Sequence, residues 1–206
     1  MGTNFRMCSP MCAVPPIPMI RLCLQAGDVC IDGKENYIKQ SFRNRYHILT
    51  AGGVKALSIP VKHTGGTPIA TCDARIEYRK PWLRDHLRTL KAAYASAPFY
   101  IHYAEAIEDI LACGAATLGE FFSQNFEKWC ALLKVTLPYR LTETYAQENF
   151  ELDLRQKIKH PSAFPEVGAV APYPQVFDDR HPFAPNLSVI DLLMNEGPAA
   201  GALLKA

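Results

Sequence analysis

The sequence lacks the features by which many proteins can be assigned to a class. No stretch approaches the roughly 20 uninterrupted apolar residues that a membrane helix requires. We find no internal repeat, no low-complexity run and no catalytic signature that names a reaction. The function therefore has to be inferred from composition, from spacing and from scattered polar residues.

Paired cysteines are also missing. Seven cysteines are scattered along the chain without a Cys-x-x-Cys pair, and an odd number cannot be fully bridged within one chain. Cys8 and Cys12 have no second ligand pair near them, as a structural zinc site would need. We therefore expect reduced thiols, no metal site and a cytoplasmic location.

Strong charge of one sign is absent as well. The net charge of +2 is too small for non-specific nucleic-acid binding through bulk charge, so any anion site has to be local. Of the 206 residues, 49% are hydrophobic and 20% charged, which suits one globular domain over residues 1–206. The apolar run after Arg6 resembles a secretory signal, but Pro15, Pro16 and Pro18 would break its helix, so we expect an extended segment there.

The hydrophobic pattern predicts an α/β fold, with a mixed sheet and flanking amphipathic helices in a single domain. Strands are expected over residues 28–32, 35–49, 56–61 and 69–78, with a hairpin turn at 50–53. Apolar residues at three- and four-residue steps predict helices from Met19 to a stop at Gly27, over 83–94, 103–111 and 118–133, and after Ser188. Clustered prolines predict an irregular loop over about 160–185.

The basic and aromatic stretch 35–49 is the first candidate site. If it is one regular strand, alternation places Lys39, Arg43 and Arg45 on the same face. Such a face could hold a small anionic substrate, such as a nucleotide sugar or an acyl donor, because guanidinium forks match phosphate and carboxylate oxygens. The alternative is an edge strand whose charges only discourage aggregation.

Two further candidates lie on expected helices. His86 shares a helix face with Trp82, and its imidazole could act as a general base or could simply pack at a domain surface. Ser188 and Asp191 have the spacing of a helix capping box, which explains both without any chemistry. Asn186 and Asn195 are less well explained by capping.

Four stretches together resemble the WbqC-like protein family. They are "IDGKENYIKQSFRNR", "LSIPV", "PWLRDHLRTLKAAYASAPFYIHYA" and "PNLSVIDLLMNEGP". The resemblance implies an α/β protein that modifies sugars in surface-polysaccharide biosynthesis. It also implies these site residues: Asp32, Lys39, Gln40, Asn44, Arg45, Trp82, His86, Asn186, Ser188, Asp191 and Asn195. Many members carry a His-Gln-Pro stretch near the start, where this chain reads "CSPMCAVPPIP" without a histidine.

Two hypotheses follow for the function. The first is a cytoplasmic transferase that modifies an activated amino sugar, for instance by N-acylation, with His86 and Asp191 as catalytic groups and Arg45 as an anion clamp beside Arg43. The second is a non-catalytic RNA- or protein-binding module that uses the basic and aromatic stretch 35–49. Neither a cofactor nor an oligomeric state is indicated by the sequence.

Overall fold

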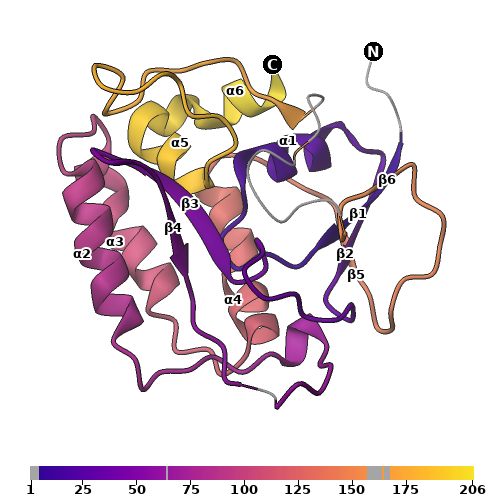
Figure 1. The fold of residues 1–206 in the computed structure, drawn as a ribbon. Helices are drawn as coiled ribbons and strands as arrows, with labels where there is room; N and C mark the ends of the chain where they lie inside the picture. The colour runs from indigo at the N-terminus through magenta and orange to yellow at the C-terminus, as the bar shows by residue number, and fades with distance from the viewer. Residues whose placement is uncertain (1–4, 64, 157–163, 165–167) are drawn as a thin grey trace.

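A four-stranded parallel sheet forms one side of the molecule (Figure 1). The computed structural model describes residues 5–63, 65–156, 164 and 168–206. The strand order is β5-β2-β1-β6, and helix α1 connects the two central strands. The bounds are β1 Arg6–Pro10, α1 Ile17–Gln25, β2 Asp28–Asp32, β5 Arg140–Leu141 and β6 Leu152–Asp153. Because all four strands are parallel, their carboxyl ends meet at one edge.

A two-stranded antiparallel hairpin and most of the helices form the other side (Figure 1). Gly53, with φ of 95°, allows the tight turn of this hairpin. The hairpin contacts α2 and α5, whereas α6 packs against α1. The remaining bounds are β3 Arg45–Thr50, β4 Gly53–Ser58, α2 Trp82–Tyr94, α3 Tyr100–Leu111, α4 Leu118–Leu132, α5 Val189–Glu196 and α6 Ala200–Lys205.

Helix α4 lies near the middle of the molecule and joins the two sides. Trp129 on this helix is fully buried, and its indole N–H donates a hydrogen bond to the carbonyl of Ala13, 3.3 Å away. Phe122 and Phe126 stack on each other and contact the ring of Tyr139. One continuous apolar core therefore extends across both sheets and the helices.

Much of the expected secondary structure is confirmed. The α/β class, the strand 28–32, the hairpin turn and the amphipathic helices are present. α3 begins at Tyr100, three residues before the expected start, and a further helix, α6, follows the stop after α5. None of the helices among the described residues is long and apolar enough to cross a membrane. In the expected irregular loop, residues 168–185 contain no strand, and residues 160–163 and 165–167 lie outside the described residues.

Two expected strands are wrong. Residues 35–49 do not form one strand, because only Arg45 onward pairs in β3, and Gln40 has φ of 58°, which interrupts any extended run. Residues 69–78 contain a short 3-10 helix, η1 (Thr71–Asp73), and isolated bridges instead of a strand. In both segments side-chain and backbone contacts with distant parts of the chain replace regular strand pairing.

Candidate functional site

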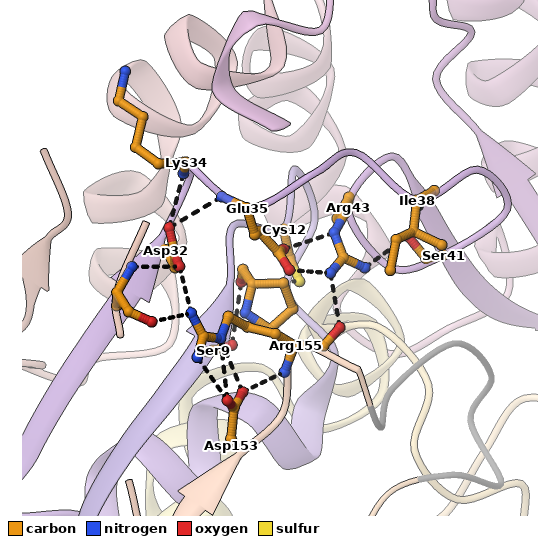
Figure 2. A network of polar contacts seen from close by, with 12 residues as sticks. Ser9, Cys12, Asp32, Lys34, Glu35, Ile38, Ser41, Arg43, Asp153 and Arg155 are labelled. Carbon is orange, nitrogen blue, oxygen red and sulfur yellow. Dashed lines mark hydrogen bonds and ion pairs between the residues drawn. The ribbon is translucent and has the colours of Figure 1, made fainter. Parts of the chain in front are cut away.

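The carboxyl ends of the parallel strands carry a buried polar network, which Figure 2 shows from close by. Asp32, the last residue of β2, is completely buried. Its Oδ1 accepts hydrogen bonds from the backbone N–H of Lys34 at 2.8 Å and of Glu35 at 3.2 Å, and from the hydroxyl of Thr142 at 2.8 Å. Its Oδ2 accepts from the backbone N–H of Ala146 at 3.2 Å. Asp32 therefore holds together the loops that follow β2 and β5.

Arg155 connects this carboxylate to strand β6. Its Nη1 donates to Asp32 Oδ2 at 2.7 Å and to the carbonyl of Ala146 at 2.7 Å, while Nη2 donates to Asp153 Oδ2 at 2.7 Å. The guanidinium also lies 4.5 Å from the ring centroid of Tyr145, a cation–π distance. Hydrogen bonds to Asp153 and Asp32 raise the pKa of Arg155, so it stays charged.

A second buried ion pair adjoins the first (Figure 2). Arg43 Nε donates to Glu35 Oε1 at 2.7 Å, Nη2 pairs with Oε2, and Nη2 also donates to the carbonyl of Arg155 at 2.8 Å. Both side chains are almost completely buried. Burial raises the pKa of Glu35 to about 7, although the bonds from Arg43 act in the opposite direction. The two ion pairs therefore form one connected network.

A hollow of about 260 Å³ opens at the same edge of the sheet. Ligands of open α/β sheets bind in the crevice outside the carboxyl ends of the strands, which is where this hollow lies. It is bounded by the ends of β2 and β5, by η1 and by the first turns of α4. The side chains that give it polar character include Lys34, Glu120, Ser123 and Thr142.

The first turn of α4 is built to fit this edge. The hydroxyl of the N-cap residue Thr117 accepts a hydrogen bond from the N–H of Glu120 at 3.1 Å. Glu120 Oε2 accepts from the N–H of Ala116 at 2.8 Å, which is a variant of the capping box in which the carboxylate reaches the residue before the N-cap. Glu120 Oε1 has no hydrogen-bond partner among the residues that the structure describes. A Cβ on Gly119 would lie 2.7 Å from the carbonyl oxygen of Cys72, so the absence of a side chain lets η1 approach the helix.

The structure brings only some of the expected site residues to this edge. Asp32 and Arg43 belong to the network, but Lys39 and Gln40 are exposed on the loop before β3. The expectation that Lys39, Arg43 and Arg45 share one face is wrong, because Arg43 turns inward to Glu35.

Two neighbours of Arg43 are used in packing of the hairpin. The amide of Asn44 donates to the carbonyl of Ile59 at 2.7 Å, and Arg45 Nε donates to the hydroxyl of Ser58 at 2.9 Å. Phe42 is buried together with Arg43, so neither presents a surface to an RNA or protein partner in this conformation. The binding-module hypothesis stays a prediction for the exposed remainder of the stretch.

His86 lies apart from the network, between α2 and β3. Its Nδ1 is 3.0 Å from the hydroxyl of Tyr46, and its ring centroid is 5.1 Å from that of Trp82. Burial lowers the pKa of His86 to about 4, so the imidazole is neutral near pH 7. His86 and Trp82 do not line the hollow, and their roles in catalysis and binding stay predictions.

Asp191 belongs to another buried cluster, in the core between α2 and α5. Its Oδ1 accepts from the hydroxyl of Tyr94 at 2.7 Å, and its Oδ2 accepts from the hydroxyl of Tyr173 at 2.6 Å and the amide of Gln175 at 3.0 Å. Burial raises the pKa of Asp191, and the hydrogen bonds from Tyr173, Tyr94 and Gln175 oppose that rise. A catalytic role for Asp191 stays a prediction.

The interpretation of Ser188 and Asp191 as a capping box is wrong. The hydroxyl of Ser188 makes no capping hydrogen bond and has no partner among the described residues, because its side chain is buried where the chain passes β3. The carboxylate of Asp191 turns to the tyrosines instead. Asn195 donates to the carbonyl of Asp191 at 2.8 Å, and Asn186 has φ of 63° just before the helix.

Sequence reasoning missed several residues at the sheet edge. Glu35, Arg155 and Asp153 complete the network, and Lys34 and Glu120 line the hollow. For Lys34 and Glu35 a signal existed, since both follow directly on a buried strand that ends in Asp32. For Arg155 none existed, because it lies 123 residues from Asp32.

Comparison with known proteins identifies the chain at the level of a family. The WbqC-like protein family model matches residues 13–162 and 161–202. No curated protein and no solved structure matches the chain. The residues of the two buried ion pairs lie within the matched residues, and so do the residues that line the hollow, with the exception of Met11.

Proposed function

The chain belongs to the WbqC-like protein family, and we propose that it is a transferase that acylates the amino group of an activated sugar. The observation that supports this proposal is the hollow at the carboxyl ends of the parallel strands, beside the buried network of Asp32 and Arg155. Its volume of about 260 Å³ is just below the roughly 300–1,000 Å³ range of small-molecule sites. A single sugar ring suits that size better than a whole nucleotide sugar.

Charges at the hollow suggest how such a substrate would lie. Lys34, the second residue after β2, is an exposed cation and would pair with a phosphate of the activated sugar. Glu120 supplies the carboxylate among the lining residues. It would accept a hydrogen bond from the amino group of the substrate. The buried network would keep the loops after β2 and β5 in place around the substrate.

The reaction needs one group that accepts a proton. With an acyl thioester as donor, the amine nitrogen attacks the carbonyl carbon, the C–S bond breaks, and the thiolate leaves. Glu120 would take the proton from the attacking nitrogen and pass it to the thiolate. Because Glu120 Oε2 is held by the N–H of Ala116, Oε1 is the oxygen that would do this.

A binding experiment tests the site. Purified protein is melted with and without a UDP-linked amino sugar, and ligand at 100 times its dissociation constant should add about 2.7 kcal/mol to the free energy of unfolding. Lys34→Ala should abolish the shift, whereas Lys80→Ala, the loss of another exposed lysine, should leave it unchanged. No shift with any nucleotide-linked amino sugar, or equal shifts in both variants, would overturn the proposed site.

A turnover experiment tests the chemistry. Acetyl-CoA and the sugar that shifts the melting temperature are incubated with the protein, and release of the free thiol is followed. Glu120→Gln preserves the capping box, so we expect normal folding, normal sugar binding and loss of turnover. His86→Gln should retain turnover. If His86→Gln lost turnover and Glu120→Gln kept it, His86 and not Glu120 would be the base.

A further inference from the structure

Helices α2 and α3 form the outer side of the molecule that is farthest from the parallel sheet (Figure 1). The exposed cations of α2 follow one helical stripe and are Arg84, Arg88 and Lys91. The exposed anions of α3 lie on its outer side and are Glu105, Glu108 and Asp109. Arg84 pairs with Asp85 at 3.5 Å, but within the described part of the chain the other five charges make no ion pair.

A groove of about 310 Å³ lies between these two helices. Apolar side chains make up most of its lining, which also includes Arg88 and Lys91 from α2 and Glu108 from α3. On the same stripe of α3 as Glu108, Ile101 is 85% exposed, whereas the other exposed large apolar residues of the described chain reach at most 51%. Apolar surface and unpaired charges of both signs therefore occur together on one face.

We propose that this face binds a second copy of the chain in a two-fold symmetric dimer. A cationic helix beside an anionic helix is self-complementary, which a two-fold symmetric interface requires. Five residues join α2 to α3, so the two helices are antiparallel neighbours. Arg88 and Glu108 line the same groove and are therefore at similar heights along the pair.

The charges also select the direction of the symmetry axis. An axis parallel to the helices places α2 of each copy over α3 of the other, at the same height, so that Arg88 faces Glu108 of the partner. An axis across the helices would place α2 on α2 and α3 on α3, where like charges repel. Only the first arrangement covers Ile101 and the groove and pairs the charges at the same time.

A charge-exchange experiment tests the dimer. Molar mass is measured by light scattering after size exclusion, and we expect the parent to have twice the mass of one chain. Arg88→Glu and Glu108→Arg should each be monomeric, with the dissociation constant raised at least tenfold, because each places like charges together. An equimolar mixture of the two variants should regain the dimer, since each new charge then faces its opposite.

Two controls keep this test independent of folding. Lys62→Glu changes an exposed lysine outside the face and should leave the dimer intact. The thermal melting of each single variant at high dilution should match that of the diluted parent, which shows that the fold is retained. A monomeric parent, a dimer that survives both single exchanges, or a mixture that stays monomeric would each overturn the proposal.

Discussion

Single residues at the sheet edge show how this fold keeps ionised groups in its interior. A buried charge is costly unless it is paired and fully hydrogen-bonded, and Arg43 and Arg155 each satisfy a buried carboxylate and a backbone carbonyl at once. Glu35 and Asp32 are the carboxylates that they neutralise. The loss of either guanidinium would leave its partner without a counter-charge.

Arg43 is therefore expected to be among the most sensitive positions of the chain. Arg43→Met would leave Glu35 buried without its partner, and because Arg43 holds the pKa of Glu35 down, Glu35 would then take up a proton. Breaking a buried pair in this way lowers the free energy of unfolding by up to about 3–5 kcal/mol. The measurement is urea denaturation at pH 7.5. Arg45→Met removes one partly exposed hydrogen bond to Ser58 and should lower the free energy by only about 1 kcal/mol. Equal losses would contradict this account.

His86 makes the stability of the protein depend on pH. Its pKa is about 4 in the folded protein and about 6.5 when it is free, so between these values the unfolded chain binds more protons. The contribution of His86 to the free energy of unfolding is therefore complete above pH 6.5. It is lost as the pH falls toward 4, by up to about 3 kcal/mol.

Urea denaturation at pH 7.5 and at pH 4.5 measures this effect. We expect His86→Gln to lose less stability between the two pH values than the parent does, because its side chain has no proton to gain. His102→Gln, on the exposed face of α3, should behave as the parent. If the parent and His86→Gln lost the same free energy of unfolding between pH 7.5 and pH 4.5, His86 would not be the source of the pH dependence.

At the scale of elements, the contact between η1 and α4 depends on one glycine. Alanine normally stabilises a helix relative to glycine by about 1 kcal/mol, but a Cβ at position 119 would meet the Cys72 carbonyl at 2.7 Å. Gly119→Ala should therefore destabilise the protein, and it should also weaken ligand binding in the hollow, which both residues line.

Thermal melting with and without ligand measures both effects. Gly52→Ala is the matched control, because the nearest atom to its new Cβ is a side-chain oxygen 3.9 Å away and its φ is not positive. We expect that variant to melt within a degree or two of the parent, as surface substitutions usually do. A stabilised Gly119→Ala variant would show that helix propensity outweighs the close approach.

At the scale of the whole molecule, Arg155 joins segments that are far apart in sequence. Its guanidinium donates hydrogen bonds to Ala146 in the loop after β5, to Asp32 at the end of β2 and to Asp153 in β6. Arg155→Lys keeps the positive charge but removes the guanidinium group that makes several hydrogen bonds at once. We therefore expect the free energy of unfolding to fall by about 1.5–3 kcal/mol. Hydrogen exchange should become faster across residues 142–148.

Arg140→Lys serves as the control for this exchange experiment. Its side chain is 40% exposed and pairs with Asp28 and Glu148 at the surface, where ion pairs contribute about 0–1 kcal/mol. We expect unchanged hydrogen exchange in that variant. If Arg155→Lys also left exchange in the loop unchanged, the loop would be held by contacts other than the buried network.

The sequence by itself determined the elements whose signals are local. The period of apolar residues along α2 and α4 and the paired glycines of the hairpin predicted these elements, because backbone geometry ties each pattern to one conformation. Asp32 was predicted as a site residue from a resemblance.

What only the tertiary structure decided is the choice of partners over long distances. Arg43 pairs with Glu35 instead of lying in the expected strand, Asp191 bonds Tyr94 instead of capping its helix, and Arg155 reaches Asp32. These choices follow from burial, since a polar group removed from water takes whichever partner the packed chain brings within reach.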